Sequence, residues 1–184
     1  DLHSFPTRRS SDLLSITSVP GGRPCGCGRR GCLERYASGT ALGVNGWELA
    51  QFRPAYAARI IELSGGDSSH IKGEAITAAA REGDPAALQC YDDLAGHLGR
   101  GLADLCAVLD PEVIVIAGGL AEAGDILLAP TREVFHTEIT ARRARPEIPV
   151  VLAEGGQYAG LVGAADLARS EEHTSELQSH YRIS

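Results

Sequence analysis

The sequence contains no methionine and a single lysine, Lys72, although 17 of its 184 residues are basic. It also lacks any run of about 18 apolar residues, which excludes a membrane-spanning helix, and it shows no signal peptide. Acidic residues outnumber basic ones by 24 to 17, which argues against nucleic acid as the main partner of this chain. A content of 43% hydrophobic and 22% charged residues is typical of one globular domain or two small ones. The missing initiator residue leads us to expect a fragment of a longer protein or a processed chain.

The two ends of the chain differ from the part between them. Residues 1–13 and 169–184 show neither helical nor strand periodicity. Both segments resemble translated sequencing adapters, so we expect the biological sequence to run from about Leu14 to Ala168. The two adapter-like segments are therefore left out of the fold prediction.

Between the ends, helical patterns alternate with short apolar runs. We expect helices at 38–51, 55–63, 71–81, 85–109, 130–143 and 160–168, and buried strands at 113–117 and 149–152. This alternation predicts an α/β sheet covered by helices. The helix at 85–109 has a good N-cap in Asp84 and a proline at its first position. Its expected buried side chains are Leu88, Tyr91, Leu98, Leu102, Leu105 and Leu109, together with the small thiols of Cys90 and Cys106.

A cluster of cysteines is the strongest chemical signal. The chain has five cysteines, an odd number, and Cys25, Cys27 and Cys32 fall within eight residues, which is not a disulfide framework. Three thiolates on a tight glycine-rich loop can point at one centre, and zinc fits them best because soft thiolates select it. A structural zinc site needs four ligands, and only three are present here. Chance clustering and a redox pair are the alternatives.

The segment from Cys25 to Gly39, CGCGRRGCLERYASG, resembles the zinc signature of the ROK family of repressors, open reading frames and sugar kinases. The resemblance continues through residues 72–85, 101–105, 110–111, 118–119 and 160–168, and so covers nearly all of 14–168. Within the family, the chain is similar to the bacterial glucokinase type. This resemblance implies an actin-like (ribonuclease-H-like) fold of two α/β domains. Residues 14–168 would form its C-terminal part and carry a zinc-binding loop.

The resemblance also assigns roles to single residues. The three cysteines match the zinc ligands of the family. Glu34 matches a glutamate that accepts hydrogen bonds from sugar hydroxyls, which a carboxylate does well. Gly118 and Gly119 match glycines that follow a strand and line the adenine-nucleotide cleft, where the backbone approaches the ligand closely. Taken alone, Glu34 would be a solvated surface charge and the two glycines a turn.

Several motifs of the family are missing from the chain. A Gly-His pair, whose histidine contacts zinc and sugar, would fall at Leu14 and Ser15, so Ser15 stands where the histidine is expected. The Asp-x-Gly-Gly-Thr phosphate loop, the Asn-Asp pair with the general base and the Glu-x-Gly-His stretch are absent. We therefore expect no catalytic residue in this chain.

The resemblance implies that the intact protein uses Mg-ATP to phosphorylate glucose to glucose 6-phosphate, with zinc in a structural role. It further implies a cytoplasmic enzyme of carbohydrate metabolism that forms homo-oligomers. The alternative is a sugar-responsive ROK transcriptional repressor, and only then would nucleic acid be a partner, through an upstream helix-turn-helix. Kinases that use polyphosphate or act on N-acylmannosamine are alternatives of the same class, because the sequence does not distinguish the sugar or the phosphoryl donor.

Overall fold

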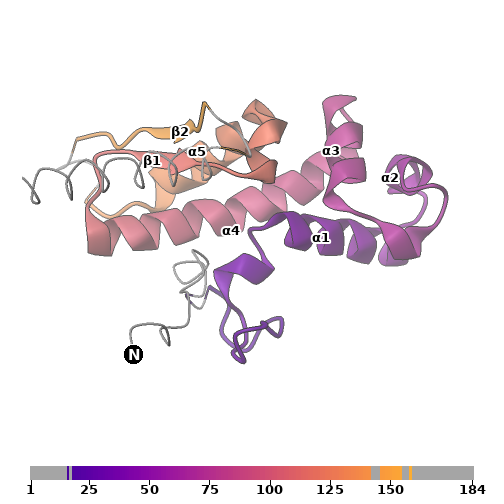
Figure 1. Ribbon diagram of the computed structural model, residues 1–184, viewed down its shortest axis with the longest axis horizontal. Helices are drawn as coiled ribbons and strands as arrows, with labels where there is room; N and C mark the ends of the chain where they lie inside the picture. Colours follow the sequence, from indigo (N-terminus) through magenta and orange to yellow (C-terminus); the bar gives the residue numbers. More distant parts are fainter. Residues whose placement is uncertain (1–15, 17, 142–145, 155–157, 159–184) are drawn as a thin grey trace, which may run out of the picture.

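Helix α4 (Pro85–Leu109) is the axis along which the other elements are arranged (Figure 1). The computed structural model describes residues 16, 18–141, 146–154 and 158. The expected helix at 160–168, Ser15 and both adapter-like ends lie outside these residues. The other helices are α1 (Gly39–Phe52), α2 (Ala58–Leu63), α3 (Gly73–Arg81) and α5 (Asp125–Glu138), and the strands are β1 (Ile114–Ile116) and β2 (Val150–Leu152). Three short 3-10 turns complete them, at Leu33–Arg35 (η2), Ser68–His70 (η3) and Gly119–Ala123 (η4).

The predicted ends of α4 are confirmed. The side chain of Asp84 accepts a hydrogen bond of 2.9 Å from the N–H of Ala87, and Asp110 ends the helix in a left-handed conformation with φ of 43°. The predicted apolar face is only partly right, because Leu88 and Leu109 are 36% and 58% exposed. Much of the buried face instead consists of small residues, which allow neighbouring helices to approach closely. These include Ala86, Ala87, Cys90, Ala95, Gly99, Gly101, Ala103 and Cys106.

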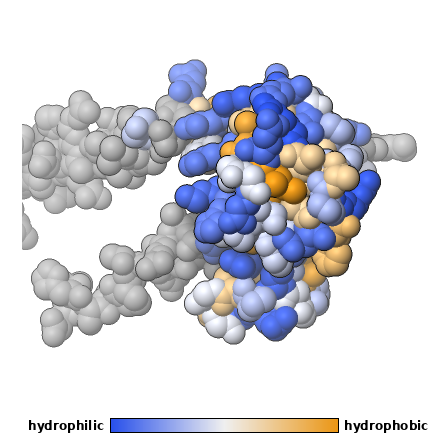
Figure 2. All heavy atoms as spheres, turned by 90° about the vertical axis from the view of Figure 1, so that its right-hand side faces the viewer, coloured by the Kyte–Doolittle hydropathy of each residue, from blue (hydrophilic) through white to orange (hydrophobic). Residues whose placement is uncertain are grey.

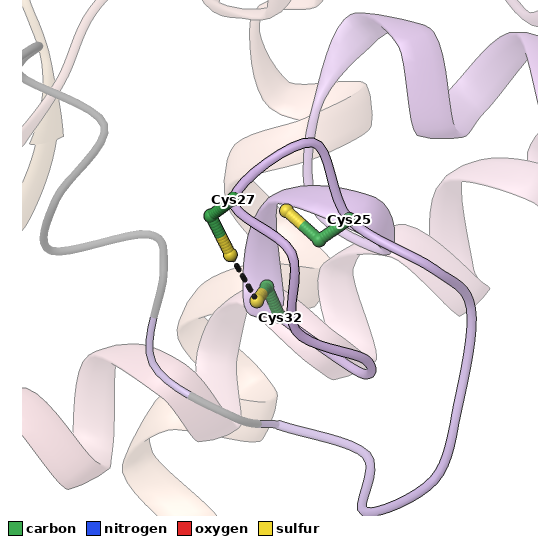
Figure 3. Close-up of side chains that lie close together, drawn as sticks. All are labelled: Cys25, Cys27 and Cys32. Carbon is green, nitrogen blue, oxygen red and sulfur yellow. Dashed lines mark hydrogen bonds between the residues drawn. The ribbon is translucent and has the colours of Figure 1, made fainter.

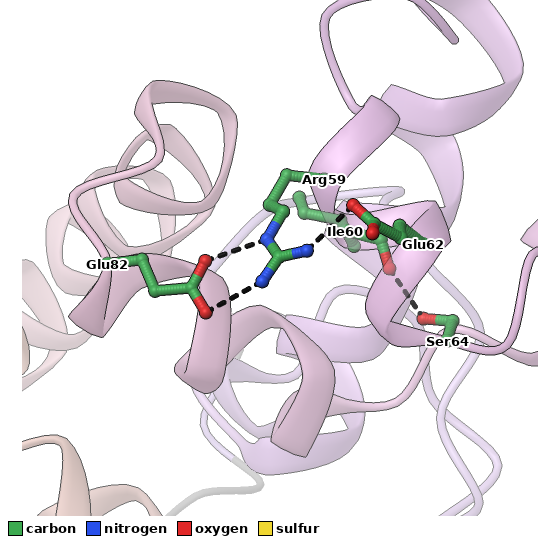
Figure 4. Close-up of polar contacts among 5 residues, drawn as sticks. All are labelled: Arg59, Ile60, Glu62, Ser64 and Glu82. Atoms are coloured by element: carbon green, nitrogen blue, oxygen red, sulfur yellow. Dashed lines mark hydrogen bonds and ion pairs between the residues drawn. The ribbon is translucent and has the colours of Figure 1, made fainter.

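Helices α1 and α3 pack against one end of α4, and α2 packs on α1 and α3 (Figure 1). Their core includes the fully buried side chains of Leu42, Ile60, Ile76 and Leu94. Arg59 of α2 donates to both carboxylate oxygens of Glu82, at 2.7 and 2.9 Å, and also to Glu62 at 2.7 Å (Figure 4). These bonds tie α2 to the end of α3. The outer surface at this end is largely hydrophilic (Figure 2).

The two strands lie at the other end of α4, next to α5 (Figure 1). They pair in parallel, with Ile114 opposite Val150, and α5 forms the crossover between them. Phe135, Ile148 and Val150 form a second core beneath this β-α-β unit. This arrangement agrees with the predicted α/β class. No helix among the described residues is long and apolar enough to cross a membrane.

Two predictions for this end were wrong. The strand expected to be buried has an exposed face, since Val113 and Val115 are 47% and 55% exposed. No further strand covers or extends the pair within the part of the chain that the structure describes. The helix expected from Pro130 begins at Asp125 and carries Pro130 in its interior. A proline in a helix interior lacks one backbone donor, and tertiary packing outweighs that loss here, because Leu127, Leu128 and Phe135 of α5 are buried.

Candidate functional site

The segment before η2 folds back on itself to form the cysteine loop, residues 23–32. The N–H groups of Ser18 and Val19 donate to the carbonyl of Gly31 at 2.8 and 3.0 Å, and Pro24 forms an antiparallel bridge with Arg30. Gly31 has φ of 76°, and a Cβ there would collide with the carbonyl of Val19. The close approach of the two segments therefore requires glycine at position 31.

The three cysteines of this loop point at a common centre (Figure 3). Their sulfur atoms all lie within 4.8 Å of one another, and those of Cys27 and Cys32 are 3.5 Å apart. A tetrahedral zinc ion with Zn–S bonds of about 2.3 Å places its sulfurs about 3.8 Å apart, so the donor set fits zinc in both type and spacing. All three are free thiols. No fourth ligand joins the group among the described residues, and Ser15 lies outside them.

The local environment separates Cys27 and Cys32 in the pKa of their thiols. Hydrogen bonds from the backbone and side chain of Arg29 lower the pKa of Cys27 to about 6. Burial, with the neighbouring sulfurs of Cys27 and Cys25, raises the pKa of Cys32 to about 11. At neutral pH these directions put a thiolate on Cys27 and a proton on Cys32. A metal ion must displace that proton to bind.

Glu34 lies in the turn η2, directly after the last cysteine of the loop. The neighbouring Leu33 is fully buried and packs against Gly101 of α4, where a Cβ would collide with its side chain. Leu33 thus anchors the turn in the core. The side chain of Glu34 is half-buried, and its carboxylate has no hydrogen bond or ion pair with another described residue. The carboxylate therefore has acceptor capacity left for a ligand.

Gly118 and Gly119 follow β1 after one intervening residue, because the strand ends at Ile116 and not at the predicted residue 117, and Gly119 lines a cleft of about 610 Å³. We call this space the Gly119 cleft. One wall is the start of α1 with the residues just before it, the second is α3 with Lys72, and the third is the turn after β1. The lining residues are Ala37, Ser38, Gly39, Leu42, Lys72, Gly73, Glu74, Thr77, Ala78, Arg81, Ala117, Gly119, Leu120 and Glu122. Gly118 borders the cleft in sequence and has φ of 92°.

All four charged residues that line the cleft were missed by sequence reasoning, and one of them is Glu122 in the turn after β1. Lys72, Glu74 and Arg81 also line the cleft, although the sequence only placed them in a helical stretch of family likeness. Arg81 donates a 2.8 Å hydrogen bond to the carbonyl of Glu122, which ties α3 to the turn after β1. The single lysine of the chain was the available signal. Helix α3 begins directly after Lys72, and no side chain caps its N-terminus. N–H groups of its first turn are therefore left for an anionic ligand.

Behind the Glu34 turn, the ring of Tyr36 stacks on His97 of α4 with 4.7 Å between centroids. Burial lowers the pKa of His97, and the charges of Arg100 and Arg23 lower it further. Protonation of His97 is therefore less favourable in the folded chain than in the unfolded one. The resulting stability is present above the ordinary histidine pKa of about 6.5 and is lost as the pH falls below it.

We expect the free energy of unfolding to decrease as the pH is lowered from about 7 to about 5. His97→Gln should flatten this slope, because the replacement cannot be protonated. Urea denaturation at several pH values measures the free energy of unfolding and so gives this slope. His70→Gln, at a largely exposed position, should keep the slope since it retains His97. An unchanged slope in His97→Gln would assign the pH dependence to other groups.

The signature loop, the turn that follows it and the β-α-β unit together define the class of protein. The chain belongs to the ROK family, whose family model matches residues 13–171.

The glucokinase of Streptomyces coelicolor is 42% identical over 163 residues, which cover 89% of this chain and 51% of the relative. The crystal structure of a ROK family glucokinase from Streptomyces griseus, in complex with glucose and AMPPNP, is similar with a TM-score of 0.82 and 41% identity, over 88% of this chain and 52% of that one. The fold is therefore that of the ROK sugar kinases. The chain spans about half the length of the curated relatives it matches.

A crystal structure of a ROK family transcriptional regulator, a homologue of the E. coli MLC protein, is also similar. Its TM-score is 0.55 with 29% identity, over 76% of this chain and 33% of the regulator. Kinases and regulators of the family thus share this part of the fold.

Proposed function

We propose that residues 14–168 are the C-terminal part of an ATP-dependent glucokinase that converts glucose to glucose 6-phosphate. One observation carries the proposal. The segment from Cys32 to Gly39 supplies a buried thiol of the candidate metal site, the half-buried carboxylate of Glu34 and part of the wall of the Gly119 cleft. The similarity to glucokinases supports glucose and ATP as the two substrates. Glu34, which would bind the sugar, is thus only a few residues away in the sequence from the wall of the cleft that would bind the nucleotide.

Each part of this segment has a distinct task in the proposed reaction. Cys25, Cys27 and Cys32 would hold a zinc ion, which stabilises the loop and takes no part in the chemistry. Glu34 would accept hydrogen bonds from glucose hydroxyls and so orient the sugar. Such transfer depends mainly on positioning and on neutralising the charge of the phosphates.

The Gly119 cleft would take the nucleotide. Gly118 and Gly119 allow its backbone to approach the ligand without a side chain between them. Lys72 and Arg81 supply positive charge on the facing wall, and the Mg²⁺ would arrive with the ATP. A cytoplasmic location and a homo-oligomeric intact protein belong to the same proposal.

Glu34→Gln tests the sugar contact in the intact protein. We expect kcat/KM for glucose to fall by about 10- to 100-fold, because a hydrogen bond to a charged group is worth about 1.5–3 kcal/mol. The KM for ATP should change little. A coupled assay for glucose 6-phosphate measures both constants. Glu133→Gln, at an exposed position of α5, is the matched control, and an equal loss in the two variants would refute the role of Glu34.

Gly119→Val tests the nucleotide cleft. A Cβ at this position meets no atom within 4 Å, so the substitution should leave the melting temperature nearly unchanged while it fills part of the cleft. We expect the KM for ATP of the intact protein to rise by at least about tenfold, since about 1.4 kcal/mol of lost contact gives that factor. Ala129→Val adds the same kind of bulk on the exposed side of α5 and should have no effect. Normal ATP kinetics in Gly119→Val would place the nucleotide elsewhere.

A sugar-responsive repressor is the second candidate function, favoured by the similarity to the ROK transcriptional regulator. In that case Glu34 would sense sugar without phosphoryl transfer. The intact protein would bind operator DNA in a sugar-dependent way and would show no kinase activity. An assay of glucose phosphorylation and an assay of DNA binding therefore separate the two candidate functions.

A further inference from the structure

Arg23 lies at the base of the cysteine loop, two residues before its first cysteine. Its carbonyl accepts a 2.8 Å hydrogen bond from the N–H of Gly31, which closes the loop. Its own N–H donates to the hydroxyl of Tyr36 at 2.7 Å, in the turn after Glu34. The backbone of Arg23 thus joins the two ends of the loop to the turn that carries the proposed sugar contact.

The guanidinium group of Arg23 extends these contacts to helix α1. It donates to the carbonyl of Arg35 at 3.0 Å, to the amide oxygen of Asn45 at 3.0 Å and to the carboxylate of Glu48 at 2.7 Å. It also lies over the ring of Tyr36, 5.0 Å from the centroid. The side chain is only 21% exposed, so solvent competes weakly for these charge-assisted bonds.

Arg23 therefore joins the loop, the turn and the helix through its own hydrogen bonds. We propose that Arg23 is a positioning residue, which fixes the cysteine loop and the Glu34 turn on α1 before a ligand binds. Its planar group satisfies three acceptors at once, which the single ammonium group of lysine does less well. The zinc-affinity measurement below rests on the proposed zinc site, whereas the hydrogen-exchange measurement does not.

The first measurement is the zinc affinity of the reduced full chain, by competition with a chromophoric chelator. Arg23→Gln should lower the affinity about 10- to 100-fold, as loss of a residue that orients metal ligands does. Arg53→Gln is the matched control, because Arg53 also lies over a tyrosine ring, that of Tyr56 at 4.2 Å, but at the far end of α1. Arg23→Lys should recover only part of the affinity.

The second measurement needs no metal. Backbone hydrogen exchange in the metal-free chain should become faster in Arg23→Gln at Gly31, whose N–H donates to the carbonyl of Arg23, and at Leu33, whose N–H donates to the carbonyl of Ile16 before the loop. Exchange at Leu128 in α5 should stay the same. Faster exchange at all three positions would mean that Arg23 stabilises the whole fold, which would overturn the proposal.

The two measurements also separate this proposal from the zinc site. If the wild-type chain binds no zinc but Arg23→Gln loosens the loop alone, the positioning role holds and the zinc site fails. If Arg23→Gln changes neither the loop exchange nor the zinc affinity, the positioning role is refuted.

Discussion

Cys32→Ala should lower the affinity of the chain for zinc by at least about 100-fold. Apparent binding free energies of structural zinc are about 10–16 kcal/mol for four ligands, so one ligand carries about a quarter of that. Cys32 is fully buried and its sulfur lies 3.5 Å from that of Cys27, so no solvent-exposed side chain can easily take its place. Competition with a chelator, at equal thiol reduction, measures the change.

Cys90→Ala provides the matched control. Cys90 is as deeply buried as Cys32, but it lies in α4 and outside the sulfur cluster. Its replacement should reduce stability by removing a buried sulfur and should leave zinc affinity unchanged. The wild-type chain should bind one zinc ion more weakly than a four-ligand site. Tight one-to-one binding with all three cysteines protected would reveal a fourth ligand. Equal zinc affinity in Cys32→Ala and wild type would refute the site.

The chain by itself should show no glucose-dependent ATP turnover. It contains no Asp-x-Gly-Gly-Thr motif and no Asn-Asp pair, so we expect it to lack both the phosphate-binding loop and the general base of the proposed reaction. Loss of general-base catalysis alone costs about 10²- to 10⁴-fold in rate. The missing phosphate loop should reduce the rate further, because the transferred phosphoryl group would no longer be positioned.

The assay compares purified residues 14–168 with the full-length glucokinase of Streptomyces coelicolor, under the same glucose and ATP concentrations. The full-length glucokinase serves as the positive control for the coupled assay of glucose 6-phosphate. Glucose-dependent turnover by the chain, removed by Glu34→Gln, would show that a general base lies within these residues. That outcome would contradict the assignment of the chemistry to another part of the intact protein.

Most helices were predicted correctly because the residues that start and stop them are adjacent to them in the sequence. Asp84 and Pro85 defined the start of α4, and the structure places the cap as expected. The start of α5 was missed because Pro130 suggests a first turn, whereas tertiary packing holds it inside the helix. The exposed face of β1 was missed for a related reason. Val113 and Val115 read as buried on pattern alone, and only the sheet shows which face is covered.

The site was predictable where its chemistry is local in sequence. The three cysteines fall within one short loop, so their spacing alone indicated a shared centre, and the structure brings their sulfurs together. The far wall of the Gly119 cleft comes from α3, about forty residues away in sequence, and no spacing rule links the two. Arg23 was missed for the same reason, because its partners Asn45 and Glu48 become neighbours only when α1 packs beside the loop.

The two-stranded sheet has a practical consequence for handling the chain. Each strand pairs on one side only within the described residues, and on the outer edge of β2 the carbonyl of Val150 already accepts a hydrogen bond from the side chain of Arg132, so the more open edge is that of β1. Val115 on the exposed face of β1 and Val113 just before the strand add apolar surface beside this edge. Unprotected strand edges of this kind are templates for pairing with other chains. Concentrated samples should therefore self-associate through the sheet, and a charged residue at Val115 should keep them dispersed.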